Sequence, residues 1–357
     1  MSAINFGTTV SLKEAASLIA HNPEMRYLLR GEAGIGKSTL IELIKKLHPN
    51  HAAAYIDAQS MDLGDAALPA ADHELKVMEY YTNQRFKMYT GPPVLLMIDE
   101  FTKAMQPVQN MLHPLLETNN PRLGDVPLPK GSIVFLTGNL SVMGVGDNLK
   151  AHTLNRVTVL DVRKPDADEW LEWAVENLLP EAAPVMAWVK QYPHCLDPVD
   201  FHNPTGNPYT FNPKTVQQSF VSARSLERAS YAVARRHHNT DNALVAALAG
   251  TIGEAAARDM QAFITYQDQL PPWKTIVEDP KNAPVPDSAG ACAVLVFGAV
   301  SRVDKQSLPG FMEYLKRMDT EWQAVFAVSL AKHPAKASLA FGNKEFASWV
   351  AQNQDVL

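Results

Sequence analysis

The chain contains little cysteine and no long apolar run. Cys195 and Cys292 are the only cysteines among 357 residues, so no disulfide framework is expected and a reducing compartment fits. The most apolar stretch, ACAVLVFGAV at 291–300, has about half the length of a membrane span. The start, MSAINFGTTV, lacks the basic and apolar blocks of a signal peptide. We therefore expect a cytoplasmic protein without a membrane segment.

An excess of positive charge is also missing. The net charge is -6 and the pI is near 6.0, so the chain as a whole has no basic footprint for nucleic acid. This argues against a nucleic-acid partner, although a locally basic pore would leave the net charge unchanged. A hydrophobic content of 46% and a charged content of 20% are typical of a globular protein, and the length allows two or three domains.

The sequence RGEAGIGKST at 30–39 has the spacing G-x-x-x-x-G-K-S. Glycines let successive backbone N–H groups surround a phosphate, Lys37 would reach the β- and γ-phosphates, and the Ser38 hydroxyl would bind Mg²⁺. A short apolar strand at 26–30 and a helical pattern at 38–48 flank the motif, which an ordinary glycine turn does not require. The predicted ATP-binding residues are Gly31, Glu32, Ala33, Gly34, Ile35, Gly36, Lys37, Ser38 and Thr39.

Strands and helices alternate through the first 165 residues. Continuous apolar strands separated by helices indicate a parallel sheet that is covered on both faces, with ligands beyond the carboxyl ends of the strands. After this region the pattern is helical, apart from an irregular connector expected at 271–288. Capping boxes are expected at Ser11 with Glu14 and at Asp166 with Glu169. The strand candidates are 26–30, 52–57, 94–99, 133–138 and 157–162.

Two acids and an amide follow two of these strands. In PPVLLMIDEF, Asp99 would hold Mg²⁺ and Glu100 would polarise the attacking water, which favours hydrolysis over transfer to a bound substrate. The alternative is a pair of solvated acids that cap the next helix. In FLTGNL, the Asn139 amide can bind the attacking water and the γ-phosphate, although Gly-Asn is also a common turn.

The order of GEAGIGKS, IDEFTKAMQPVQNMLHPLLE, FLTGN and LNRVTVLDV resembles the MoxR-type branch of the AAA+ ATPases. The segment DAQSMDLGDAALP also resembles a stretch of this family. The resemblance covers about residues 1–240 and implies an α/β fold with a five-stranded parallel P-loop sheet in the order 5-1-4-3-2. It divides the chain into a nucleotide-binding domain at 1–165, a helical lid at 166–240 and an additional helical C-terminal region at 241–357.

The resemblance also assigns residues. The phosphate loop, the acid pair and Asn139 match Walker A, Walker B and sensor 1. Arg156 matches an arginine finger that enters the neighbouring subunit's site, and Arg224 matches the sensor 2 arginine of the lid. A solvated charge at the start of a strand would also explain Arg156, and a surface salt bridge would explain Arg224. Thr102 departs from the family, whose members often carry asparagine there.

Two segments, 71–91 and 118–132, resemble family insertions that lie near the ring axis and before sensor 1. Tyr80, Tyr81, Arg85, Phe86 and Lys87 could contact a substrate, but their helical spacing is more typical of a partly buried face.

We interpret His194, Cys195 and His202 as loop residues, because no second cluster at zinc spacing accompanies them. The sequence RRHH at 235–238 is interpreted as the solvated end of a helix.

Three functions are compatible with these features. The resemblance favours an ATP-driven ring, usually a hexamer, that remodels a protein partner; relatives often work with a partner that carries a von Willebrand factor A domain, which this chain lacks. A nucleic-acid motor or loader is the second hypothesis. The third is a nucleotide-controlled scaffold whose slow hydrolysis times release.

Overall fold

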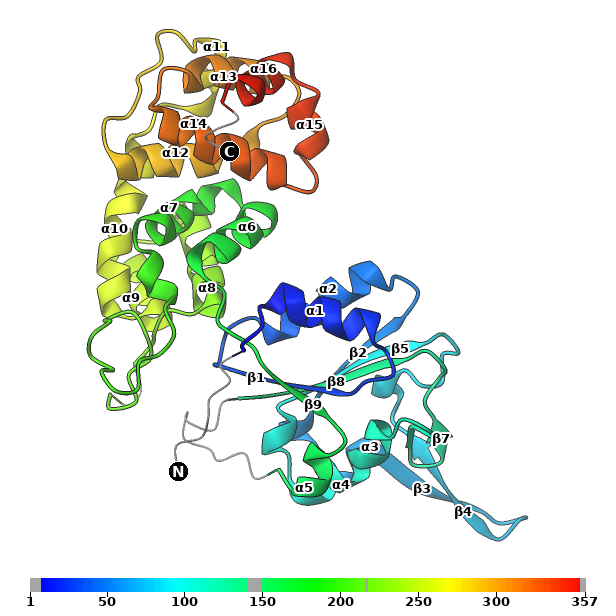
Figure 1. Ribbon diagram of the computed structural model, residues 1–357. Coiled ribbons are helices and arrows are strands. Elements are labelled where there is room, and N and C mark those ends of the chain that lie inside the picture. Colours follow the sequence, from blue (N-terminus) through cyan, green and yellow to red (C-terminus); the bar gives the residue numbers. More distant parts are fainter. Residues whose placement is uncertain (1–7, 140–148, 216–217, 354–357) are drawn as a thin grey trace. The chain divides into compact units, whose positions relative to one another are not determined.

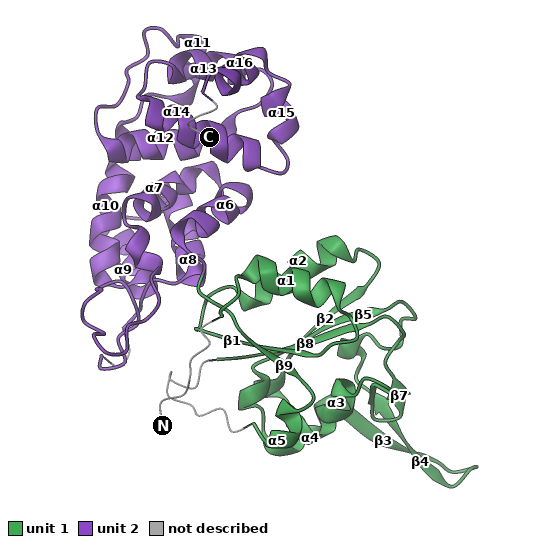
Figure 2. Cartoon of the chain, in the orientation of Figure 1, with its two compact units in different colours: residues 1–164 green, residues 165–357 purple. Residues whose placement is uncertain are grey.

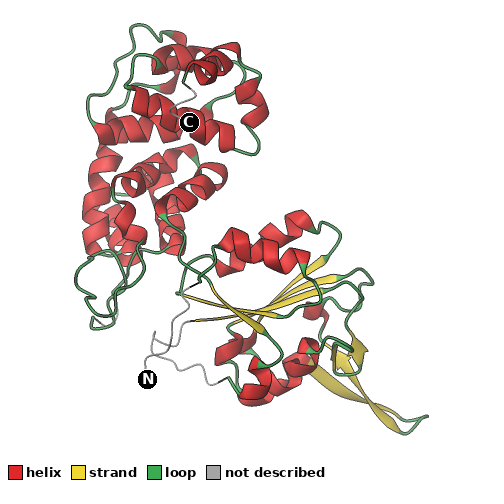
Figure 3. Ribbon diagram, viewed as in Figure 1, coloured by secondary structure: helices red, strands yellow, loops and turns green. Residues whose placement is uncertain are grey.

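The computed structural model describes residues 8–139, 149–215 and 218–353. The chain forms two compact units, Met1–Lys164 and Pro165–Leu357 (Figure 2). Every described strand lies in the first unit, and the described secondary structure of the second unit is entirely helical (Figure 3).

The first unit contains a five-stranded parallel sheet in the order β2-β5-β8-β1-β9. Numbered along the chain, this order is 5-1-4-3-2, which confirms the predicted α/β fold and sheet topology. Each strand lies within two residues of its predicted position. The strands are β1 Tyr27–Gly31, β2 Ala52–Asp57, β5 Val94–Asp99, β8 Ile133–Asn139 and β9 Thr158–Asp161.

Helices cover both faces of this sheet (Figure 1). Successive residues of a strand point to opposite faces, so Leu95 and Met97 of β5 join a core with α1 and α2, whereas Leu96 and Ile98 join a second core with α4. Burial on both faces explains why these strands are continuous apolar runs. The helices are α1 Leu12–His21, α2 Leu40–Leu47, α3 Leu63–Ala66, α4 Gln106–Leu112 and α5 Ala151–Leu154.

Two hairpins lie outside the main sheet. Strands β3 (Ala67–Asp72) and β4 (Val77–Thr82) form one of them, and β6 (Arg122–Leu123) and β7 (Val126–Pro127) form the other. The helical face inferred around Tyr80 and Tyr81 is therefore wrong, because both tyrosines lie on β4 and are exposed. The pattern was misleading because exposed apolar residues occupy consecutive positions of this strand.

The two hairpins contact each other through the turn between β6 and β7. The Tyr80 amide donates a hydrogen bond of 2.8 Å to a carboxylate oxygen of Asp125. Gly124 has a φ of 57°, and a Cβ at this position would lie 2.8 Å from the Tyr80 Cβ. A glycine is needed here for both the left-handed backbone and the close approach.

The second unit packs its helices around one apolar core, which includes side chains from α6 through α16. This core runs through both helical parts expected from the sequence, and their division at residue 240 stays a prediction. The helices are α6 Ala167–Asn177, α7 Ala183–Gln191, α8 Ala223–Ala234, α9 Asp241–Ile252, α10 Glu254–Gln269, α11 Trp273–Glu278, α12 Ala289–Arg302, α13 Leu308–Leu315, α14 Thr320–Lys332, α15 Ala337–Phe341 and α16 Lys344–Gln352.

The most apolar segment of the chain is the middle of this core. Every residue from 291 to 300 is buried in α12, which packs against α7, α10 and α14. Among the described residues, no helix has the length and apolarity needed to span a bilayer.

Of the local features predicted for the helical segments, the capping boxes are confirmed and the irregular connector is confirmed only in part. Both predicted capping boxes are present, at Ser11 with Glu14 and at Asp166 with Glu169. The connector expected at 271–288 is only partly irregular, because it contains α11. Pro271 and Pro272 precede the first residue of that helix, so they do not interrupt it.

Candidate functional site

Groups from four strands meet at the carboxyl edge of the sheet. In the strand register, Gly31 of β1 lies beside Asn139 of β8, and Asp57 of β2 lies beside Asp99 of β5. Because all these strands are parallel, their carboxyl ends share one edge. The topology therefore brings together the phosphate loop, the acid pair and the amide that the sequence singled out.

The phosphate loop leaves β1 through a tightly packed glycine. A Cβ on Gly31 would lie 2.5 Å from the Ile35 side chain and 2.9 Å from the Val162 carbonyl oxygen. Gly34 and Gly36 have φ values of 76° and 98°, a region that glycine adopts without strain. A short 3₁₀ helix, η1 (Lys37–Thr39), then leads into α2, and no side chain caps its first turn. Backbone N–H groups at such a start suit an anion.

Lys37 extends back over this loop and is 7% exposed. Its ammonium donates hydrogen bonds to the Gly31 and Glu32 carbonyl oxygens, at 3.0 and 3.2 Å, and to Asn139 Oδ1 at 2.8 Å. A buried ammonium needs such acceptors to offset its desolvation. These contacts place a cation between the phosphate loop and the end of β8.

Thr137 joins the two acids. Its buried hydroxyl donates to a carboxylate oxygen of Asp99 and accepts a 3.2 Å hydrogen bond from the Glu100 amide. The Tyr55 hydroxyl donates to the other carboxylate oxygen of Asp99 at 2.6 Å. Glu100, directly after the last residue of β5, has a φ of 51°, in the left-handed region.

Among the described residues, the Glu100 carboxylate contacts Asn139 and Lys103. Asn139 Nδ2 donates to both of its oxygens, at 3.0 and 3.1 Å, and Lys103 Nζ lies 2.9 Å from Oε2. Polar contacts thus run from Lys37 through Asn139 and Glu100 to Lys103. The sequence interpretation missed Lys103. The only feature of the sequence that could have indicated this contact is its position, three residues after the candidate catalytic acid Glu100.

The donors near this edge fit a hard cation. Ser38 supplies a hydroxyl and Asp99 a carboxylate, and oxygen ligands of these types suit Mg²⁺. Within the described ranges no group of three or more His, Cys, Asp or Glu residues could hold a metal. A magnesium ion that shares phosphate oxygens and water with one carboxylate does not require such a group.

The two arginines implied by the resemblance lie outside this network. Arg156 Nε donates to a Glu117 carboxylate oxygen at 2.8 Å, and Arg156 also donates to the His152 carbonyl oxygen at 2.9 Å. Its side chain is 35% exposed. Arg224 lies in the first turn of α8, exposed, and makes no ion pair or hydrogen bond with a described residue. A surface salt bridge to the described part of the chain therefore does not explain Arg224.

The candidate cluster of His194, Cys195 and His202 is only partly buried, because both histidines are exposed. Cys195 is buried in the helical core, and the His194 ring packs against Tyr209 at 5.3 Å between ring centroids. The interpretation of 235–238 as solvated is wrong for Arg236, which is 7% exposed and pairs with Asp268 at 2.6 Å.

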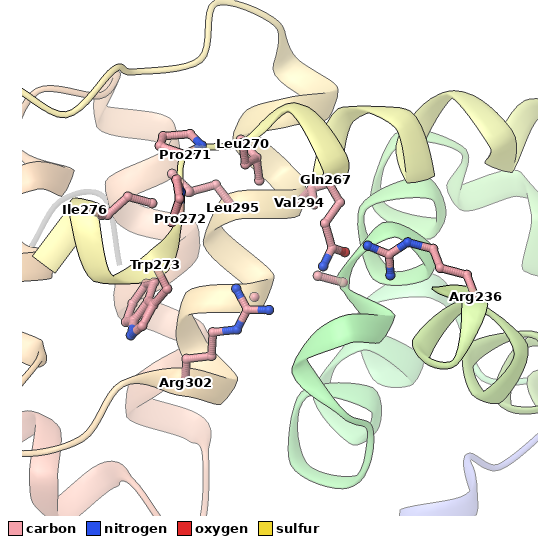
Figure 4. A pocket seen from close by; sticks show the side chains of 12 residues that line it. Arg236, Gln267, Leu270, Pro271, Pro272, Trp273, Ile276, Val294, Leu295 and Arg302 are labelled. Carbon is pink, nitrogen blue, oxygen red and sulfur yellow. The ribbon is translucent and has the colours of Figure 1, made fainter. Parts of the chain in front are cut away.

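The helical unit contains a cavity of about 170 Å³ (Figure 4). Figure 4 shows Gln267, Arg236 and Arg302 around it, together with apolar side chains from α11, α12 and the segment that joins α10 to α11. Both arginines have carboxylate partners, because Arg236 pairs with Asp268 and Arg302 lies 3.6 Å from Glu181. The cavity is therefore close to charge-neutral and lacks the glycine-rich backbone that surrounds a phosphate.

Comparisons with known proteins give a limited result. No family model matches the chain, and no curated protein matches it. A putative ATPase from Cytophaga hutchinsonii has a similar structure, with 16% identity and a TM-score of 0.33, over 47% of this chain and 51% of that one. NtrX from Brucella abortus, in complex with ADP, matches with 12% identity and a TM-score of 0.35, over 70% and 64%. The chain thus spans less than two thirds of either length, and the fold assignment depends on its own sheet topology.

Proposed function

We propose that the chain is a magnesium-dependent ATPase of the AAA+ type, in the MoxR-like branch, that converts ATP and water to ADP and phosphate. One observation carries the proposal: Lys37, Asn139 and Glu100 form a continuous set of contacts beside Asp99, at the carboxyl edge of a 5-1-4-3-2 sheet. Ligands of open parallel sheets bind at this edge.

Each side chain would have a distinct role. Lys37 would exchange its contact with Asn139 for oxygens of the β- and γ-phosphates, while the loop amides surround the phosphate chain. Ser38 and Asp99 would hold Mg²⁺, Asp99 through water, and the bound ion would neutralise charge on the phosphate oxygens. Glu100 would accept a proton from the attacking water, and Asn139 would hold that water in line with the bond that breaks.

Further parts of the proposal come from the sequence resemblance. The chain would form a homo-oligomeric ring, usually a hexamer, in which Arg156 of one subunit reaches the ATP of the next and Arg224 contributes from the lid. Its partner would be a protein, of the kind that carries a von Willebrand factor A domain. Exposed apolar side chains on the β3–β4 hairpin, including Leu75, Met78 and Tyr81, are compatible with a protein partner.

Two variants test the ATPase proposal together. Lys37→Ala should abolish ATP binding, because the site loses the cation that faces the phosphates. ATP should stabilise the wild-type protein by about 2.7 kcal/mol at a hundredfold excess over the dissociation constant, and calorimetry should detect no such shift in Lys37→Ala. Equal shifts in the two proteins would contradict the binding site.

Glu100→Gln should still bind ATP but hydrolyse it very slowly, because the amide cannot accept the proton from water. Steady-state phosphate release and ATP affinity are the two measurements. Glu42→Gln, an equivalent change on the exposed surface of α2, is the matched control and should behave like the wild type. Near-normal turnover in Glu100→Gln would move the catalytic role to another residue.

A further inference from the structure

Lys103 is placed to fix the direction of the Glu100 carboxylate. It is the last residue of a short 3₁₀ helix, η4 (Phe101–Lys103), that begins directly after Glu100. Its ammonium lies 2.9 Å from Glu100 Oε2, and the two side chains are only 25% and 24% exposed. Lysine and glutamate side chains are usually far more exposed than this.

The surroundings distinguish this ion pair from an ordinary one on a helix surface. A solvent-exposed pair contributes little, because two long side chains must be ordered in water. Here the Glu100 amide is already held by Thr137 and its backbone is left-handed, so only the side-chain torsions of Glu100 remain to be set. Asn139 and Lys103 both contact the carboxylate and set these torsions.

These two restraints should respond differently to ATP. In the proposed ATPase, Asn139 would turn toward the attacking water and the γ-phosphate, which weakens its hold on Glu100. Lys103 ends the short helix that begins directly after Glu100, and no phosphate contact is assigned to it. Its contact with Oε2 can therefore persist while Asn139 rearranges.

We propose that Lys103 is a positioning residue, which binds Oε2 of Glu100 and thereby directs Oε1 toward the attacking water. This inference rests on the proposed function. In the hydrolytic step the water oxygen forms a bond to the γ-phosphorus, the bond to the β-phosphate oxygen breaks, and Oε1 takes one proton from the water. Lys103 keeps its protons throughout and acts only through Glu100.

The test is Lys103→Met, which keeps the length of the side chain but removes the charge. Displacing a reacting group by about 1 Å can cost about 100-fold in rate, so we expect kcat to fall about 10- to 100-fold while the dissociation constant for ATP stays the same. Lys103→Arg should recover most of the rate, because a guanidinium can also bind Oε2. Lys332→Met removes a lysine that pairs with Glu172 at 2.6 Å in the helical unit and should leave kcat unchanged.

A double variant separates positioning from a general structural role. If Lys103 acts through Glu100, adding Lys103→Met to Glu100→Gln should cause no further loss of turnover, because coupled residues are not additive. A further loss in the double variant would overturn the inference. So would wild-type kcat in Lys103→Met, or a parallel loss of kcat and ATP affinity that Lys103→Arg fails to restore.

The failure of this inference can be told apart from that of the ATPase itself. Loss of turnover in Glu100→Gln with normal turnover in Lys103→Met would overturn the role of Lys103 alone. Normal turnover in Glu100→Gln would overturn both. Should Lys103→Met not fold, Lys103→Gln keeps a polar head without the charge and is expected to show the same fall in kcat.

Discussion

The two units differ in whether their polar residues gather at one place. In the first unit Lys37 and Glu100 both contact Asn139 at the edge of the sheet. In the second, a cation such as Arg236 is neutralised locally by Asp268, and the cavity beside it is close to neutral. A parallel sheet ends all its strands at one edge and so gathers polar groups, whereas packed helices end at many places and distribute them. The difference predicts that ATP chemistry belongs mainly to the first unit.

The largest expected effect concerns Arg156 in the first unit. An arginine finger contributes about 10³- to 10⁵-fold in rate, or about 4–7 kcal/mol, so Arg156→Ala should bind ATP but hydrolyse it poorly. Mixing Arg156→Ala with Lys37→Ala should restore part of the activity if the arginine serves the neighbouring subunit. For equal random mixing, about one interface in four would be complete.

The structure adds a control for that experiment. Glu117→Gln removes the carboxylate that binds Arg156 and leaves the arginine in place, so hydrolysis should persist. No recovery in the mixture, despite demonstrated co-assembly, would mean that Arg156 acts within its own subunit or is structural.

A substitution in the helical core tests whether the two units unfold separately. Trp188 is fully buried and packs edge-on against Tyr209, so Trp188→Ala should destabilise the second unit by about 3–5 kcal/mol. The indole N–H has no hydrogen-bond partner among the described residues. Trp188→Phe should therefore cost less, because it removes that unpaired donor and keeps an aromatic ring.

Calorimetry with and without ATP provides the measurement. ATP should raise the unfolding temperature of the first unit, whereas Trp188→Ala should lower that of the second. A single transition that responds to both changes would contradict the separation into two units.

The smallest effect concerns Arg224, the residue through which the helical unit would take part in hydrolysis. A charge-assisted hydrogen bond contributes about 1.5–3 kcal/mol, so Arg224→Ala should slow turnover about 10- to 100-fold. Arg228 is exposed on the same helix, and Arg228→Ala is the matched control. Equal turnover in the two variants would confine the ATP chemistry to the first unit and leave Arg224 without a catalytic role.

The sequence predicted those features that depend on short-range patterns. Apolar runs located the strands, and their alternation with helices predicted the parallel sheet. Serine or aspartate followed three residues later by glutamate predicted both capping boxes. The order of motifs predicted which side chains meet, since parallel strands share one edge. The roles of these side chains stay predictions.

Features that depend on distant or unusual geometry were missed. The partner of Arg236 lies 32 residues away at Asp268, so a run of basic residues was interpreted as solvated. The β3–β4 hairpin exposes consecutive apolar residues, and its pattern therefore resembled a helix. The contact between Lys103 and Glu100 depends on the left-handed backbone of Glu100, directly after β5. The spacing of the motif does not reveal that backbone conformation.

At position 100, the residue that would give the highest thermal stability differs from the residue that the proposed hydrolysis needs, because the backbone of Glu100 is left-handed. For a residue with a Cβ, such a backbone costs about 1–2 kcal/mol, and glycine or asparagine would adopt it more readily. Stability design based on the backbone alone would thus replace Glu100 and lose the carboxylate proposed to activate water. A variant optimised only for heat resistance should therefore retain ATP binding and lose hydrolysis.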